Sequence, residues 1–260
     1  AYYETTLELA DTRVAYVFRF TDAAGKTCYF SEDGVTKTYD FALSYYNFFQ
    51  FPFINPVDLM PVPDWTSSAV FYQIFVDRFA MGSQTKDRSY LTLKWGDIPN
   101  NHDFAGGDLA GITGKLDYLQ RLGVNALYLT PIFLSPSYHK YDTVDYYRID
   151  PQFGTEADLG ALVAQVHRRG MHIVLDGVFN HCAAGFAPFA DAVAKGRDSE
   201  YFDWFIVKGD RIDTTRPNYE MFAFCRDMPK LNTSNPAVRD FVCGVGRYYV
   251  AKFGIDGWRL

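Results

Sequence analysis

From Ala69 onward the sequence alternates short apolar runs with amphipathic segments, an order that few folds accommodate. Nearly continuous apolar runs predict four buried strands, at 70–76, 124–129, 172–175 and 255–260. Because helices separate these runs, the strands are expected to pair in parallel through right-handed crossovers. A doubly wound sheet and a closed barrel both satisfy this rule.

Three helices are predicted between the strands, each from apolar residues at helical spacing that follow a capping residue. They cover 109–122, 155–170 and 235–253. Asp108 is the predicted N-cap of the first helix. The second begins with Thr155 and Asp158, which is the pattern of a capping box.

The turn after the first strand favours the barrel. It reads Asp77-Arg78-Phe79, without the glycine-rich phosphate-binding turn of dinucleotide-binding sheets. Four strand–helix repeats make about half of a barrel, whose usual length is about 250 residues. We therefore expect residues 64–260 to be the N-terminal half of a barrel. A buried strand at 255–260 would otherwise be an unpaired edge, so the chain is expected to be a fragment of a longer protein.

The first sixty residues follow a different pattern. Alternation at 5–9, a β-branched and aromatic run at 13–20, and a short run at 28–30 predict a small antiparallel sheet. Prolines between positions 52 and 63 disfavour both a helix and a central strand. We place a domain boundary near 61–64, between an all-β segment at 1–60 and the α/β region.

Composition limits the partners of the chain. Apolar residues make up 48%, yet no apolar run reaches the roughly 18 residues that span a bilayer. The balance of 31 acidic and 25 basic residues gives a net charge of −6, which argues against nucleic acid as a partner. Aromatic residues make up 18%, which fits a well-filled core and also a cleft that binds sugars. Four widely spaced cysteines predict reduced thiols.

Polar side chains lie just beyond the predicted strands, where both candidate folds place their active sites. The run at 139–142 lies beyond the second strand, Asp176 and His181 follow the third, and Arg259 lies in the fourth. Each alone has a structural explanation, such as a buried ion pair or a satisfied loop histidine. Together they predict a site at one rim. The sequence contains no defensible Ser-His-Asp or Cys-His arrangement and no HExxH zinc motif.

Four motifs resemble the ordered signatures of the alpha-amylase family of glycoside hydrolases. They are FAGGDL at 104–109, DGVFNH at 176–181, MPKLN at 228–232 and GWRL at 257–260. The MPKLN motif and the HKYDT run at 139–143 are similar to the neopullulanase, cyclomaltodextrinase and maltogenic amylase subgroup. Residues 1–60 resemble the second half of the β-sandwich carbohydrate-binding module that precedes the barrel in that subgroup.

The resemblance implies a (β/α)8 TIM barrel with an inserted domain at 179–234, after the third strand. It also implies starch degradation by retaining hydrolysis of α-1,4 bonds, with α-1,6 bonds as a further linkage and transglycosylation as a further reaction. Retention uses two carboxyl groups about 5–5.5 Å apart. In the family the nucleophilic Asp directly follows the residue matching Leu260, and the other carboxylates lie farther on. We therefore expect no catalytic carboxylate and no turnover in this chain alone.

The resemblance also assigns roles at the rim. His181 would hydrogen-bond the reacting glucose, and Tyr141 would stack on it. His139 would line the same subsite. Arg259 would orient the nucleophile and help to keep it ionised. Asp176, as a partner of this arginine, and Asn180 would support the site structurally.

The calcium loop of the subgroup departs here from its usual sequence. Met81, Ser83 and Lys86 stand where Asn, Asp and Asn are typical, and calcium needs six to eight oxygen ligands. We therefore expect no metal and no cofactor. Our hypothesis is that the Lys86 ammonium takes the vacated cation position, paired with Asp108 or Asp87. The alternative is a solvated lysine.

The expected partners are α-glucan oligosaccharides (maltooligosaccharides, cyclodextrins or pullulan), with no nucleic acid and no membrane. The sandwich module of the subgroup often builds a dimer, so a homodimer of the full-length protein is a further expectation. A cytoplasmic location is slightly favoured over secretion, although the chain begins with Ala1 and its natural N-terminus is not visible.

Three other functions stay open. They are a glucan-binding segment without catalysis, a secreted α-amylase or glucanotransferase, and an unrelated barrel enzyme such as an aldolase. The aldolase would need a Schiff-base lysine at a strand end, and the predicted strands end without one.

Overall fold

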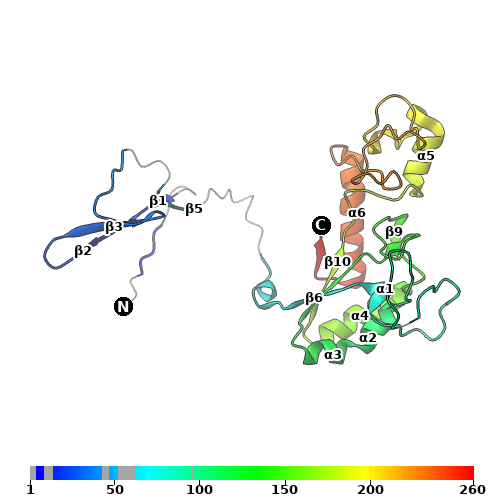
Figure 1. The fold of residues 1–260 in the computed structure, drawn as a ribbon, viewed down its shortest axis with the longest axis horizontal. Helices are drawn as coiled ribbons and strands as arrows, with labels where there is room; N and C mark the ends of the chain where they lie inside the picture. Colours follow the sequence, from blue (N-terminus) through cyan, green and yellow to red (C-terminus); the bar gives the residue numbers. More distant parts are fainter. Residues whose placement is uncertain (1–3, 9–13, 43–46, 52–61, 95) are drawn as a thin grey trace. The chain divides into compact units, whose positions relative to one another are not determined.

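The computed structural model describes residues 4–8, 14–42, 47–51, 62–94 and 96–260 (Figure 1). The chain divides into two compact units, residues 1–67 and residues 68–260. The proline-containing stretch 52–61, with the start of the boundary predicted near 61–64, lies outside the described residues.

The first unit contains two small antiparallel sheets, which confirms the predicted antiparallel pairing. One sheet contains β2 (Phe18–Thr21), β3 (Thr27–Ser31) and β4 (Gly34–Thr36), and the other contains β1 (Val14–Tyr16) and β5 (Phe49–Phe51). Asp22 shapes the turn between β2 and β3, because its carboxylate accepts hydrogen bonds from the backbone N–H groups of Ala24 and Lys26. The strand predicted at 5–9 is wrong over the described residues 4–8, which are exposed and have no ladder partner.

The second unit is built on a parallel sheet with the strand order β11-β10-β7-β6. Its strands are β6 (Phe71–Ile74), β7 (Ala126–Leu129), β10 (His172–Asp176) and β11 (Gly257–Arg259). These are the four predicted strands, in the predicted parallel pairing. β6 is shorter than expected because Val76 already belongs to the short helix α1 (Val76–Phe79). In the described part of the chain the sheet is open, so closure of a barrel stays a prediction.

Two of the predicted helices are confirmed. α4 (Glu156–Arg168) begins with the predicted capping box between Thr155 and Asp158. α6 (Pro236–Phe253) begins at Asn235, whose side chain accepts a hydrogen bond from the backbone N–H of Ala237.

The single helix predicted at 109–122 is wrong, because the chain forms two short helices there. They are α2 (Leu109–Gly114) and α3 (Leu116–Arg121). The break follows Gly114, a poor helix former, and the N–H of Lys115 bonds back to the carbonyl of Ile112. Both helices still bury the predicted apolar positions, namely Leu109, Ile112, Leu116 and Leu119.

Several elements escaped the sequence patterns. A hairpin follows β7, and the stretch 179–234, where no helix was predicted, contains a helix with a buried face. These elements are β8 (Phe133–Leu134), β9 (Asp145–Ile149) and α5 (Ala187–Lys195), with 3-10 turns at η2 (Asp64–Ser68), η3 (Gly196–Asp198) and η4 (Phe202–Trp204). Phe189 and Ala192 form the buried face of α5, which lies in this unit at the end opposite α2 and α3 (Figure 1).

The FAGGDL segment packs its backbone directly onto the end of β6 and the start of α1. The buried Asp77 carboxylate accepts hydrogen bonds from the N–H groups of Ala105, at 2.9 Å, and Gly106, at 3.1 Å. A Cβ atom at Gly107 would lie 1.9 Å from the carbonyl oxygen of Val76, so only glycine fits there. This contact fixes the position of the segment against the end of β6.

Candidate active site

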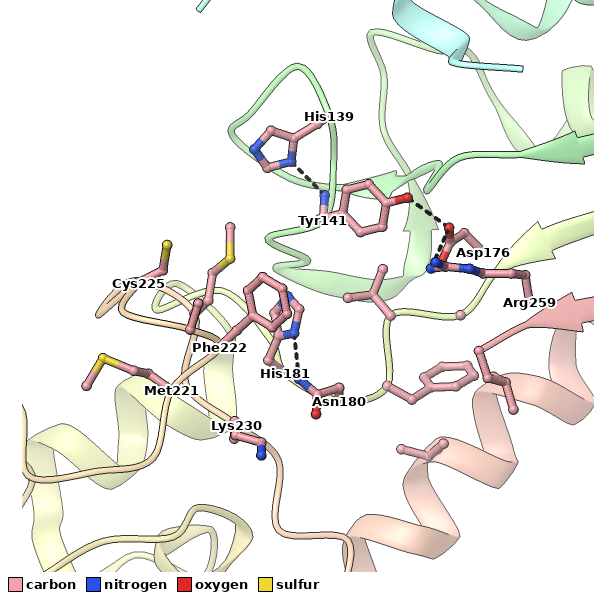
Figure 2. Close-up of a pocket in the computed structure, with 17 residues that line it drawn as sticks. His139, Tyr141, Asp176, Asn180, His181, Met221, Phe222, Cys225, Lys230 and Arg259 are labelled. Atoms are coloured by element: carbon pink, nitrogen blue, oxygen red, sulfur yellow. Dashed lines mark hydrogen bonds and ion pairs between the residues drawn. The ribbon is translucent and has the colours of Figure 1, made fainter. Parts of the chain in front are cut away.

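A cavity of about 990 Å³ opens at the carboxyl ends of β10 and β11 (Figure 2). One wall is the loop that carries His139 and Tyr141, and another is the segment 176–181 that follows β10. The loop 221–230 lies across from them, and Arg259 completes the rim from β11. The structure therefore brings the residues predicted for substrate binding and site support to one cavity.

Asp176 is the buried hub of this rim. It pairs with Arg259 across β10 and β11, and the arginine Nη1 lies 3.3 Å from both carboxylate oxygens. Oδ2 also accepts hydrogen bonds from the hydroxyls of Tyr141, at 3.1 Å, and Tyr128. Its side chain is 1% exposed, whereas that of Arg259 is 54% exposed. A carboxylate with three donors is suited to hold the site together, as expected for the partner of the arginine.

The two tyrosines on Asp176 are hydrogen-bond donors at ordinary pH. Burial raises the pKa of Tyr141, with a smaller opposing effect from its contact with Tyr128. Burial also raises the pKa of Tyr128, and its hydrogen bond to Asp176 adds to this. Both hydroxyls therefore stay protonated, and the ring of Tyr141 remains an uncharged flat surface in the cavity.

His139 lies on the same loop and takes part in its backbone structure. Its Nδ1 accepts a hydrogen bond from the N–H of Tyr141 at 3.1 Å, so the neutral ring carries its proton on Nε2. Burial lowers the pKa of His139; the Asp142 carboxylate opposes this, and the Lys140 ammonium adds to it. His139 is thus a neutral donor at the cavity wall.

His181 presents a second neutral imidazole. The Asn180 amide donates to its Nδ1 at 3.0 Å, which leaves the ring proton on Nε2. Nε2 is buried and has no partner at hydrogen-bond geometry among the described residues. Burial lowers the pKa of His181, against smaller effects of the Tyr141 backbone and Asp142. A polar ligand in the cavity would satisfy this donor.

Phe222 is a cavity residue that sequence reasoning missed. Its ring stacks on the imidazole of His181, with centroids 4.6 Å apart and planes inclined by 24° (Figure 2). The same side of the cavity is also lined by Met221, Ala223, Cys225, Met228 and Lys230. The motif at 228–232 was identified from the sequence. The aromatic residues just before that motif were the signal that could have pointed to Phe222.

Lys86 lies in a separate, buried cluster. Its ammonium lies 3.0 Å from Asp108 Oδ2 and donates to the backbone carbonyl oxygens of Gly106 and Gln152. The side chain is 7% exposed, so the alternative of a solvated lysine is wrong. The ion pair with Asp108 is one of the two that the sequence predicted, and Asp87 instead bonds to Ser89.

The residues around Lys86 do not fit a calcium ion. The Asp108 carboxylate already accepts hydrogen bonds from the N–H groups of Gly82, Ser83 and Gly111. The ammonium already lies between the carboxylate and two carbonyl groups, and calcium would need several more oxygen ligands. Across the described residues, no cluster of three or more His, Cys, Asp or Glu side chains could hold a metal ion.

The cavity presents a single carboxylate. Asp176 is the one Asp or Glu among the described residues that line it, and it is already engaged by Arg259. Retaining cleavage of a glycosidic bond needs a second carboxyl group about 5–5.5 Å from the first, with both free to react. The described residues that line the cavity therefore do not supply the pair of carboxyl groups that this reaction uses.

Comparisons with known proteins identify relatives of both units. The model "Alpha amylase, catalytic domain" matches residues 73–260, and "Alpha amylase, N-terminal ig-like domain" matches residues 1–55. A maltogenic alpha-amylase from Bacillus acidopullulyticus is 44% identical over 95% of this chain and 42% of its own length. A cyclomaltodextrinase from Thermoanaerobacter pseudethanolicus is 44% identical over 100% of this chain and 45% of its own length. The chain thus spans less than half the length of these relatives.

A solved structure has a similar fold over most of this chain. The cyclic alpha-maltosyl-(1→6)-maltose hydrolase from Arthrobacter globiformis, in complex with its cyclic substrate, superimposes with a TM-score of 0.73 and 46% identity. The match covers 77% of this chain and 45% of that structure. Within the described ranges, no helix has the length and apolar character needed to cross a membrane.

Proposed function

The chain belongs to the alpha-amylase family of glycoside hydrolases, and we propose from this that its full-length protein hydrolyses α-1,4-glucosidic bonds with retention of configuration. The proposed substrates are maltooligosaccharides, cyclodextrins or pullulan, with α-1,6 bonds as a further linkage and transglycosylation as a side reaction. One observation carries the proposal. The cavity combines the uncharged ring of Tyr141 with the unpartnered Nε2 of His181, which is a flat surface and a donor suited to a glucose ring.

We assign roles to the cavity residues accordingly. Tyr141 stacks on the reacting glucose, His181 donates from Nε2 to one of its hydroxyl groups, and His139 lines the same subsite. Asp176 and Asn180 hold these groups in place, through the Tyr141 hydroxyl and the His181 ring respectively.

The nucleophile is proposed to be an aspartate directly after Leu260. Arg259 precedes it on β11 and has a half-exposed guanidinium, whose charge would hold that carboxylate in its ionised form. The general acid and the third carboxylate would come from later strands. Asp176 transfers no proton in this scheme, because its oxygens are occupied by Arg259 and two tyrosines.

The same relatives support a proposal for the wider organisation of the full-length protein. We propose that residues 1–60 are part of a carbohydrate-binding sandwich module, that 64–260 are part of the catalytic barrel and that 179–234 are its inserted domain. A homodimer and a cytoplasmic location are proposed for the full-length protein; a relative from Bacillus subtilis is named an intracellular maltogenic amylase. We also propose that activity needs no metal, because Lys86 supplies the positive charge beside Asp108.

The test is an assay of the full-length protein on maltoheptaose, β-cyclodextrin and pullulan. NMR of the first product should show the α-anomer, and replacing the residue after Leu260 by alanine should abolish turnover. Residues 1–260 alone should show no turnover above background. Formation of the β-anomer, or hydrolysis by residues 1–260, would overturn the proposed mechanism. Binding without any turnover by the full-length protein would favour a glucan-binding role instead.

A further inference from the structure

Lys140 is a fully buried lysine in the loop that carries His139 and Tyr141. Its side chain is 0% exposed, and its ammonium lies 2.8 Å from Asp150 Oδ2. The ammonium also donates to the carbonyl of Ser135 at 3.0 Å. A third hydrogen bond, of 2.5 Å, goes to the side-chain oxygen of Gln152. An ammonium has three N–H donors, so this one is saturated inside the protein.

The backbone of Lys140 is in the left-handed region, with φ of +62°. This conformation costs a non-glycine residue about 1 kcal/mol or more, so other contacts must hold it. It places the Lys140 side chain in the interior, while the neighbouring His139 and Tyr141 side chains reach the cavity (Figure 2). The strained turn therefore directs the buried Lys140 side chain, which anchors the loop, away from the two side chains that reach the cavity.

Asp150 links the Lys140 ammonium to Ser135, at the start of the loop. Its Oδ2 accepts from the N–H of Ser135 at 3.0 Å, as well as from the Lys140 ammonium. Its Oδ1 accepts from the N–H of Gln152 at 2.9 Å. Ser135 thus receives support at both its N–H and its carbonyl, and the loop is closed at its base by one buried ion pair.

We propose that Lys140 is a positioning residue for the substrate site: its buried ammonium, held by Asp150, Gln152 and Ser135, fixes the turn that presents His139 and Tyr141 to the cavity. The role is distinct from those already assigned, because the fully buried Lys140 side chain does not line the cavity. Its importance for catalysis rests on the proposed function, whereas its effect on the loop does not.

The main test compares Lys140→Met and Lys140→Gly in the full-length protein. Methionine keeps the size of the side chain and removes the charge, while glycine also removes the backbone strain at φ +62°. We expect both variants to raise KM for maltoheptaose roughly tenfold, with kcat changed less than about threefold, which corresponds to losing one stacking contact. If the backbone alone set the turn, Lys140→Gly would keep the wild-type KM, and this result would overturn the proposal.

Lys86→Met is the matched control, because it also removes a buried ammonium from a buried aspartate. The Lys86 ammonium contacts Gln152 only through its backbone carbonyl, so the acceptors of Lys140 remain in place. We expect Lys86→Met to lower the melting temperature with KM unchanged. An equal rise of KM in this control would assign the effect to general destabilisation and would overturn the proposal.

Hydrogen exchange gives a readout that needs no substrate. In Lys140→Met, amides in 135–142 should exchange at least tenfold faster, while those in β10 stay protected. Unchanged exchange in the loop would overturn the positioning role. Faster exchange with no glucan hydrolysis by the wild type would instead remove the proposed function and keep the role of Lys140.

If Lys140→Met fails to fold, Gln152→Ala tests the same proposal. This variant removes one acceptor and retains the ion pair with Asp150, so it should fold. We expect faster exchange in 135–142 and a KM two- to threefold higher, in proportion to the single hydrogen bond lost. Wild-type values of both quantities would contradict the proposal.

Discussion

Asp176 and Arg259 occupy paired positions on two neighbouring parallel strands, and the arginine Nη1 lies 3.3 Å from each carboxylate oxygen. The contact aligns the ends of β10 and β11 at the rim of the cavity. The carboxylate also accepts the hydroxyl of Tyr141, so the cavity loop is attached to the same point. One buried acceptor thus sets the mutual positions of three elements.

Asp176→Asn should therefore destabilise the fold. The neutral amide weakens the contacts with Arg259 and two tyrosine hydroxyls, and hydrogen bonds to a charged group contribute about 1.5–3 kcal/mol each. We expect the melting temperature to fall by several degrees in differential scanning calorimetry. Asp210→Asn, which weakens an exposed pair with Arg197, is the control and should change it little. Equal shifts in the two variants would contradict the role of Asp176.

Substitutions of Tyr141 should separate its ring from its hydroxyl. Tyr141→Phe removes the hydrogen bond to Asp176 and keeps the stacking surface, so KM for maltoheptaose should change less than about threefold. Tyr141→Ala removes both, and KM should rise roughly tenfold. Steady-state kinetics on the full-length protein measure the difference. Equal values of KM in the two variants would show that the ring does not bind sugar.

Stability should fall on mild acidification because of two histidines. Burial lowers the pKa of both His139 and His181 in the folded protein. Below the unfolded pKa of about 6.5, the unfolded chain takes up protons that the folded chain refuses, so the free energy of unfolding decreases as pH falls. At higher pH both states are neutral, and the contribution vanishes.

Melting temperatures between about pH 7.5 and 5 measure this effect. The double variant His139→Gln/His181→Gln should show a shallower decline over this interval than the wild type. An identical pH dependence in both proteins would mean that these imidazoles take up protons as readily in the folded chain as in the unfolded one.

Calcium should not stabilise this protein. The Lys86 ammonium already lies beside Asp108, so addition of calcium or of a chelator should leave the wild-type melting temperature within about 1 °C. Lys86→Met leaves the Asp108 carboxylate buried without its cation and should lower the melting temperature clearly. A rise in the wild-type melting temperature on adding calcium would contradict this view.

The parts of the fold that the sequence predicted depend on local patterns. The strands and the capping box at Thr155 are specified by spacing within about a dozen residues, and the structure contains them. The strand expected at 5–9 shows the limit of this approach, because alternation cannot supply a partner strand. The split of the predicted helix after Gly114 shows that apolar spacing can continue across a break.

The site shows the same division. Positions at strand ends indicated Asp176, His181 and Arg259, and the structure places them at one cavity. Phe222 stacks on His181, and the buried Lys140 pairs with Asp150. No local sequence pattern predicts either contact. Such contacts depend on the packing of loops from different parts of the chain, which the sequence of either loop does not encode.

The close approach of Gly107 to the carbonyl of Val76 bears on how such enzymes are classified. Glycine is required at this position because two stretches of backbone touch. Its presence therefore indicates the shape of the scaffold. Two proteins can share it and still cleave different linkages. Substrate class is therefore better sought in the loops around Tyr141 and Phe222, whose side chains line the cavity, than in the motif by which membership is recognised.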